Sequence, residues 1–253
     1  MTDAPTQPPV TPPERPQAER AVCGPILMYH QIRPLPPHSD VLRGLSVDPR
    51  AFRRQMRALK ALGYRGMSVT DLQWRLPQAR REKLFAITFD DGFRNVFEHA
   101  LPVLDELGFT ATCYFVSGRL GGSNDWDRRL ATAESALMDL GALREWRAHG
   151  HEVGAHTVDH VALSDVPSPA AWRQIAHSKA QLEDAAGCPI MSFCYPYGAL
   201  DANVRRLVIE AGFRNATTTV RGRADARTDP FLLPRIAVPG GRGVARFLGR
   251  FFR

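Results

Sequence analysis

Two adjacent carboxylates, Asp90 and Asp91, directly follow a short apolar run at residues 84–89. The run is typical of a buried strand in a parallel sheet, and Gly92 ends it. Because side chains alternate between the faces of a strand, one carboxylate can bind a cation while its neighbour takes a reacting proton. The simpler alternative is that Asp90 or Asp91 caps a helix that begins near Arg94.

Two histidines four residues apart, His156 and His160, form the second candidate group. They would share one face if that turn is helical, and this spacing suits a single metal ion. Together with an aspartate from another strand end they would supply two nitrogen ligands and one oxygen ligand and leave positions open for water, as catalytic metal sites do. The same spacing also occurs by chance on surface helices.

The elements that must position these residues alternate between strand patterns and helical patterns along the chain. Polar residues follow the strands repeatedly, which favours a single parallel α/β barrel over a doubly wound sheet. The clearest helix is predicted to begin at Asp48 and Pro49, an N-cap followed by proline at the first helical position. Another carries apolar residues between Val96 and Leu107. Strand patterns lie at residues 25–30, 66–68, 84–89, 111–116, 152–156, 191–195, 213–219 and 231–238.

Composition limits the class of protein. The chain has 253 residues, 44% of them hydrophobic, which is ample for a sizeable core. It lacks an apolar run of the roughly 20 residues that span a membrane, and its first residues lack the pattern of a secretory signal, so we expect a cytoplasmic protein. The net charge is +7, but the arginines are scattered along the chain, which argues against nucleic acid as a partner. The four cysteines, Cys23, Cys113, Cys188 and Cys194, lack C-x-x-C spacing and are expected to be reduced and buried.

The two ends of the chain differ from its middle. Residues 1–20 contain six prolines among polar residues and are predicted to form a disordered arm before a domain at 21–240. Residues 241–253 carry apolar side chains at helical spacing, with arginines largely on the other side. This tail is predicted to be a basic amphipathic helix, which either contacts an anionic membrane or docks against the barrel. Docking is favoured because the tail is short and Gly249 lies in its middle.

Three ordered motifs resemble those of the polysaccharide deacetylases, the NodB-homology domain of carbohydrate esterase family 4. They are Thr88-Phe89-Asp90-Asp91, His156-Thr157-Val158-Asp159-His160 and Tyr195-Pro196-Tyr197-Gly198. The resemblance covers roughly residues 25–240 and implies a distorted (β/α)7-type barrel that removes acetyl groups from N-acetylated sugars with one divalent metal. By this resemblance Asp91, His156 and His160 would bind the metal, Asp90 would be the general base, and the backbone N–H of Tyr197, next to Pro196, would stabilise the oxyanion.

The chain departs from the commonest form of the family at the acid and at one arginine. Most members carry the acid histidine in a leucine-x-histidine motif near the C-terminus, but residues 231–253 contain no histidine. The run that ends at His30 is similar to the branch of poly-N-acetylglucosamine deacetylases with the acid on the first strand, which makes His30 the expected general acid. Cys194 stands near the place of the usual arginine. We expect Arg235 to replace that arginine by pairing with Asp90, although an arginine at a strand end can equally bind a helix C-terminus. A D-x-x-D-W motif is also missing, which leaves open what tunes His30.

The expected reaction is hydrolysis in which metal-bound water loses a proton to Asp90 and attacks the acetamide carbonyl, while His30 protonates the leaving amine. Zinc is the default metal for this ligand set, with cobalt, nickel and iron as alternatives. Trp126, in a glycine-rich segment at 118–127, is either a platform for the sugar or a packing residue. Two other functions use the same residues: a non-haem iron oxygenase, and a carbohydrate-binding module that has lost catalysis. Asp90 beside a metal ligand favours hydrolysis.

Overall fold

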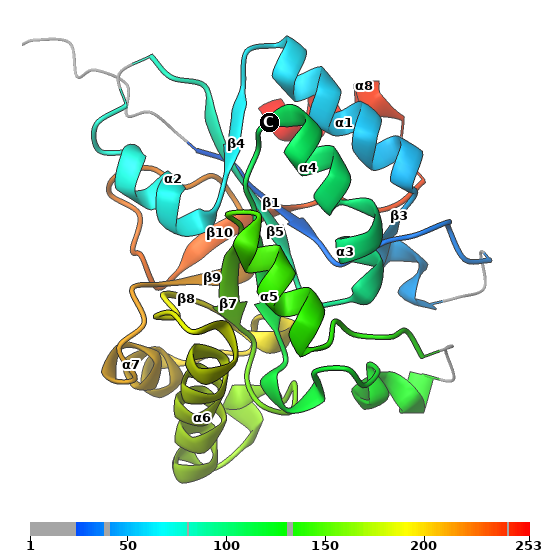
Figure 1. The fold of residues 1–253 in the computed structure, drawn as a ribbon. Coiled ribbons are helices and arrows are strands. Elements are labelled where there is room, and N and C mark those ends of the chain that lie inside the picture. The colour runs from blue at the N-terminus through cyan, green and yellow to red at the C-terminus, as the bar shows by residue number, and fades with distance from the viewer. Residues whose placement is uncertain (1–23, 38–40, 80, 131–133, 242) are drawn as a thin grey trace, which may run out of the picture.

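Seven parallel strands close into a barrel (Figure 1). The computed structural model describes residues 24–253 except 38–40, 80, 131–133 and 242, so the predicted arm at 1–20 and Cys23 lie outside the described residues. The barrel order is β1-β10-β9-β8-β7-β6-β5, and direct pairing of β1 with β5 completes the ring. The prediction of a distorted (β/α)7-type barrel is therefore confirmed. Its strands are β1 Ile26–Tyr29, β5 Leu84–Phe89, β6 Thr112–Phe115, β7 Glu152–Ala155, β8 Ser192–Cys194, β9 Asn215–Arg221 and β10 Leu233–Ala237.

Strand β5 is the centre of this arrangement. All six of its residues are buried, and it pairs with β1 and β6 along its second half and with β4 (Arg65–Met67) along its first half. A continuous apolar run is what a strand covered on both faces requires. A separate two-stranded parallel ladder, β2 (Gln31–Ile32) with β3 (Ser46–Val47), lies just after β1.

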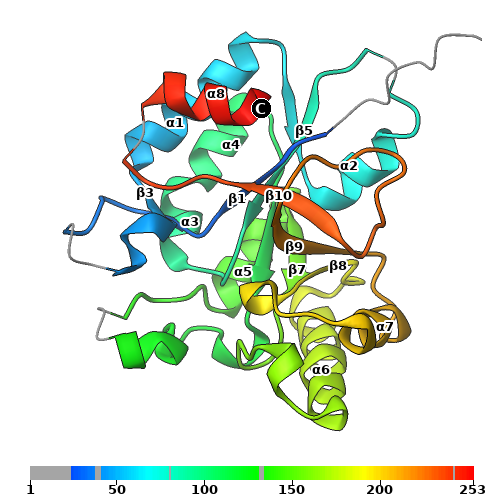
Figure 2. The same cartoon turned by 180° about the vertical axis from the view of Figure 1, so that it is seen from behind.

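Helices cover the outside of the barrel (Figures 1 and 2). Asp48 accepts hydrogen bonds from the N–H groups of Arg50 and Ala51 and so caps α1 as its sequence predicts. The helix predicted between Val96 and Leu107 is divided in two at Ala100, because Pro102 lacks the N–H of a continuous helix and starts a new first turn. The helices are α1 Pro49–Ala61, α2 Val69–Arg75, α3 Arg94–His99, α4 Leu101–Leu107, α5 Leu140–Ala148, α6 Ser168–Ala186, α7 Ala202–Glu210 and α8 Val244–Phe252.

The C-terminal segment is docked against the rest of the domain. It forms α8, whose Phe247 and Phe251 are buried. The ring of Phe251 meets those of Tyr64 and Phe85 at centroid distances of 5.0 and 5.7 Å, in edge-to-face geometry. The apolar face of α8 is therefore part of the core.

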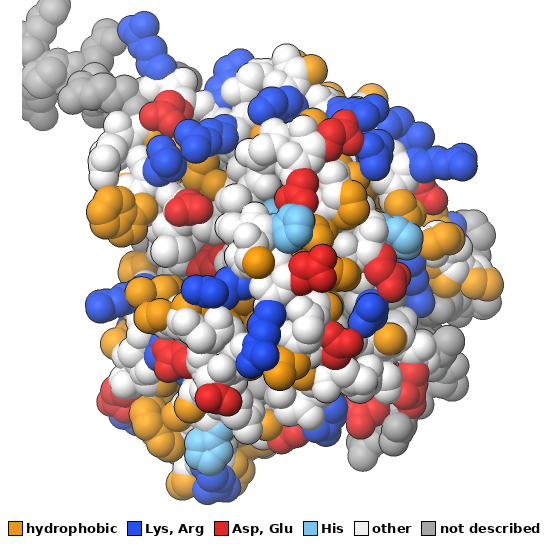
Figure 3. Space-filling model, in the orientation of Figure 1, with side chains coloured by type: hydrophobic (Ala, Val, Ile, Leu, Met, Phe, Trp, Pro, Cys, Tyr) orange, Lys and Arg blue, Asp and Glu red, His pale blue; other side chains and the backbone are white. Residues whose placement is uncertain are grey.

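The distribution of surface charge and the burial of the cysteines can be compared with what the composition predicts. On the face seen in Figure 3, basic and acidic side chains are interspersed. None of the helices that the structure describes is both long and apolar enough to cross a membrane. Cys113 and Cys194 are buried free thiols, whereas Cys188 is only partly buried, because it lies in the turn after α6.

Candidate active site

The three predicted metal ligands lie together at the carboxyl ends of β5 and β7. Asp91 follows β5, and His156 follows β7. Asp91 Oδ1 is 3.3 Å from His156 Nε2 and 3.2 Å from His160 Nε2. One donor atom from each of the three buried residues lies within 4.8 Å of the other two. This set of two imidazoles and one carboxylate suits a single divalent metal ion.

The turn that carries the two histidines is not helical. Thr157 and His160 have φ values of 64° and 57°, in the left-handed region. The turn is fixed by its neighbours: the amides of Ser117 and Gly118 donate to the carbonyls of Thr157 and Val158, and Gln174 of α6 accepts from two amides of the turn. The imidazoles therefore come together through a turn with left-handed residues and not through helical periodicity. Strained backbone of this kind is common at functional sites.

Hydrogen bonds to the ring nitrogens show that a metal ion fits the site. His156 Nδ1 lies 2.8 Å from the carbonyl oxygen of Cys194. A carbonyl only accepts, so Nδ1 carries the proton and Nε2 presents a lone pair to Asp91. Asp91 Oδ1 is buried and has no hydrogen-bond partner among the described residues. Two acceptors 3.3 Å apart repel unless a cation or a proton lies between them.

The electrostatic surroundings keep Asp91 ionised. Burial by itself raises the pKa of this carboxyl, but the charge of His160 and the hydrogen bonds from His156 and His160, when these imidazoles are protonated, outweigh burial and hold the pKa well below its usual value. Asp91 also has a left-handed backbone, with φ of 75°. The sharp turn at the end of β5 directs its side chain towards the histidines, while Asp90 faces another partner.

Arg235 is the partner of Asp90. Its guanidinium binds Asp90 through two parallel hydrogen bonds, NH1 to Oδ1 at 2.7 Å and NH2 to Oδ2 at 2.8 Å. The Arg235 side chain is fully buried, and its other hydrogen bonds go to Thr88 Oγ1, to the carbonyl of Thr218 and to Cys194 Sγ. Burial raises the pKa of Asp90, but the charge and hydrogen bonds of Arg235, with smaller contributions from His30 and His156, hold it below its usual value. The alternative that Arg235 binds a helix C-terminus is wrong.

His30 lies beside the same carboxylate. It follows β1, and its Nε2 is 3.8 Å from Asp90 Oδ2. Its side chain is 18% exposed, so it stays accessible while Asp90 is almost fully buried. Among the described residues, Asp90 is the carboxylate that forms an ion-pair contact with His30. The D-x-x-D-W motif that could otherwise tune His30 is missing from the sequence.

The third motif forms one wall of the site. Tyr197 has a left-handed backbone with φ of 59°, whereas Pro196 before it is buried. The Tyr197 hydroxyl is 3.0 Å from His160 Nδ1, and its side chain is 59% exposed. Trp126 also contacts His160 by stacking, with ring centroids 4.5 Å apart and planes at 21°. One face of Trp126 thus packs on a candidate metal ligand, and the exposed ring of Tyr197 is the more accessible surface for a sugar.

Several residues that hold the histidine turn in place were not predicted from the sequence. The carbonyl of Cys194, the hydroxyl of Tyr197 and the amide of Gln174 orient the histidine turn. Their only signal in the sequence is that Cys194 and Tyr197 lie at or just beyond a strand end. The capping alternative for the two aspartates is wrong, because Phe93 is the N-cap of α3 and no side chain caps that helix.

Comparisons with known proteins agree with this geometry. The family model for polysaccharide deacetylase matches residues 78–216, more than half of the chain. YxkH of Bacillus subtilis, a protein assigned to the polysaccharide deacetylases, is 27% identical over 232 residues, covering 90% of this chain and 76% of YxkH. The poly-β-1,6-N-acetyl-D-glucosamine N-deacetylase of Staphylococcus epidermidis is 21% identical over 225 residues, covering 84% and 78%. Among solved structures, the Streptococcus pyogenes deacetylase PplD in complex with acetate has the same fold, with a TM-score of 0.78 and 24% identity over 91% of this chain and 98% of that one.

Proposed function

The chain belongs to the polysaccharide deacetylase family, and we propose that it hydrolyses the acetyl groups of an N-acetylhexosamine polymer with the help of one divalent metal ion. Family membership makes it a hydrolase of the carbohydrate esterase family 4 type. The observation that carries the proposal is the buried Asp90–Arg235 ion pair next to the donors of Asp91, His156 and His160. A base held ionised beside a metal site is what hydrolysis requires.

Asp91, His156 and His160 would hold the metal. When bound, a divalent ion polarises the acetyl carbonyl and lowers the pKa of a water molecule towards neutrality. Zinc suits two nitrogens and one oxygen, with cobalt, nickel and iron as alternatives. The hydrogen bond from His156 Nδ1 to Cys194 and the contact of His160 Nδ1 with Tyr197 leave both Nε2 atoms directed at Asp91.

The proton transfers belong to Asp90 and His30. Asp90 is ionised because of Arg235, so it can accept the proton of the attacking water. His30, on the more exposed side of Asp90, protonates the leaving amine. The backbone N–H of Tyr197 donates to the oxyanion of the tetrahedral intermediate, and its exposed ring lies where a neighbouring sugar unit can stack.

The name of the Staphylococcus epidermidis relative favours β-1,6-linked poly-N-acetylglucosamine as the first substrate to test. The position of His30 after the first strand also supports this substrate, because the poly-N-acetylglucosamine deacetylase branch has its acid histidine there and not near the C-terminus. Oligomers of the same sugar with β-1,4 linkage are the matched comparison, because they differ only in the linkage.

The experiment is to measure acetate release from both oligomers by chelator-stripped protein, before and after zinc or cobalt is added. We expect release only after metal addition, and faster release from the β-1,6-linked oligomer. The Asp90→Asn protein is the control, since it should bind metal but release little acetate. Absence of release by protein that holds one metal ion per chain would refute the proposed substrate class, and release unaffected by the chelator would refute metal dependence.

A further inference from the structure

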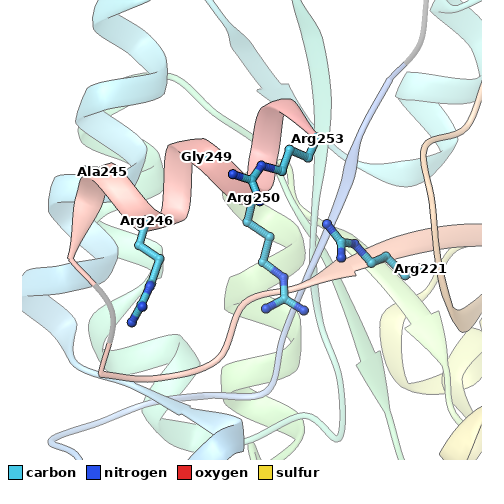
Figure 4. Close-up of a pocket in the computed structure, with 6 residues that line it drawn as sticks. All are labelled: Arg221, Ala245, Arg246, Gly249, Arg250 and Arg253. Carbon is cyan, nitrogen blue, oxygen red and sulfur yellow. The ribbon is translucent and has the colours of Figure 1, made fainter.

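A surface cavity of about 560 Å³ lies between α8 and the end of β9, and four of the six residues that line it are arginines (Figure 4). Arg221 is the last residue of β9, Arg253 directly follows α8, and the others lie within α8. Figure 4 shows the side chains of Arg246 and Arg250 extending from α8 into this space and Arg221 reaching towards them from the opposite side. None of these residues belongs to the metal and catalytic cluster. The lining residues are Arg221, Ala245, Arg246, Gly249, Arg250 and Arg253.

The docking of α8 brings these charges together. Phe247 and Phe251 face the core, so the residues at 246, 250 and 253, which share one side of the helix by their spacing of four and three, line the cavity. The small residues Ala245 and Gly249 leave the space between the arginines open, and an added Cβ at Gly249 would meet no atom within 4 Å. The cavity thus follows from the same helical pattern that buries the apolar face.

Three of the four arginines in this lining, Arg221, Arg246 and Arg253, have no carboxylate partner among the described residues. Elsewhere, exposed arginines such as Arg205 and Arg206 form ion pairs with Asp229 and Glu210. Within the described residues, no ion pair is formed by Arg221, Arg246 or Arg253. Arg246 also lies in the first turn of α8, which contains no acidic residue, and positive charge is unfavourable at a helix N-terminus.

We propose that this cavity binds a phosphate group. Guanidinium groups bind phosphate oxygens in pairs and with fixed geometry, and a bound anion would relieve the mutual repulsion of the arginines. The cavity is far larger than the roughly 30 Å³ share of one water molecule, so it has room for a phosphate attached to a larger group. Because Phe247 and Phe251 are committed to the core, contact of this tail with an anionic membrane would use lipid phosphates and not insertion of the apolar face.

The test uses the full chain and two sources of phosphate. Binding of inorganic phosphate is measured by calorimetry, and binding to vesicles of mixed phosphatidylglycerol and phosphatidylcholine, or of phosphatidylcholine alone, by sedimentation. The variant Arg221→Gln/Arg246→Gln removes two charges from the cavity. The matched control Arg173→Gln/Arg214→Gln removes two charges from exposed positions on α6 and before β9.

We expect the cavity variant to bind at least tenfold more weakly than the control variant to inorganic phosphate, to the anionic vesicles or to both, with equal thermal midpoints. Loss of phosphate binding would identify a soluble phosphorylated ligand, and loss confined to anionic vesicles would identify a lipid headgroup. Equal binding by the two variants, or binding of neither source by the unmodified protein, would overturn the proposal. Acetate release should be the same in both variants, so this outcome is independent of the deacetylase test.

Discussion

Replacement of Arg235 tests the central feature of the site. The Arg235→Met variant keeps a side chain of similar length but loses the two hydrogen bonds to Asp90 and those to Thr88, Thr218 and Cys194. Asp90 is almost fully buried, so it would be left as a charge without its partner. Removing one member of a buried ion pair costs about 3–5 kcal/mol. We therefore expect a clearly lower free energy of unfolding at neutral pH.

The same change should alter the pH dependence of catalysis. Burial raises the pKa of Asp90, and Arg235 contributes most to lowering it, so the pKa must rise in the variant. Below this higher pKa Asp90 is protonated and cannot accept a proton, so the rate of the variant decreases as the pH falls. We expect the acid limb of the kcat/KM profile to move to higher pH, so that the loss relative to the unmodified protein is largest at the acid end of the profile and becomes smaller as the pH rises.

The assay is acetate release between pH 5 and 9, with thermal unfolding of the same samples. Arg235→Lys is the matched variant, because it keeps the positive charge but cannot form the two parallel hydrogen bonds; we expect a smaller shift. A purely structural role for Arg235 would lower the unfolding midpoint and leave the acid limb of the pH profile in place. That result, or a rate within a few-fold of the unmodified protein, would refute our reasoning.

Three further predictions follow from other residues. Asp91→Ala should abolish metal binding and turnover together, whereas Asp90→Asn should retain metal, measured by atomic absorption, and lose turnover by about 10²-fold or more; near-normal rates would exclude Asp90 as the base. His30→Ala should lower kcat by about 10²-fold with metal content unchanged, and an unaffected rate would assign the acid role to another group. Burial lowers the pKa of His151 to about 4, so between pH 4 and 6.5 only the unfolded chain is protonated at this position, and stability should decrease by about 3 kcal/mol as the pH falls through that window. Urea unfolding of His151→Phe should show a smaller decrease, and an identical pH dependence would contradict this cause.

The sequence was sufficient for the barrel and for the residues that meet at its open end. Asp90, His156 and Arg235 are far apart in the chain, but each lies at or just beyond the end of a parallel strand pattern or within its last residues, and parallel strands end at one edge of a barrel. The strand patterns thus predict a shared edge for these residues, whereas their roles and the pairing of Arg235 with Asp90 were expected from the resemblance to the polysaccharide deacetylases.

The local geometry of the histidine turn could not be predicted in this way. A spacing of four residues fits a helix and also fits a strained turn, and the choice is made by Ser117, Gly118 and Gln174, which lie in other elements. The division between α3 and α4 had a visible signal in Pro102. The stacking of Trp126 on His160 had none, because it depends on how a loop folds back over the site.

The pairing of β1 with β5 links catalysis to the completion of folding. Tyr29 is in register with Phe89, and the amide of Asp90 donates to the carbonyl of Tyr29. The proposed acid, His30, and the proposed base, Asp90, are therefore the next residues on either side of the seam that closes the ring. A slip of one residue along this seam would turn one side chain to the opposite face. This contact joins segments about 60 residues apart in the chain, so the proposed acid and base are neighbours only when β1 and β5 have paired in this register.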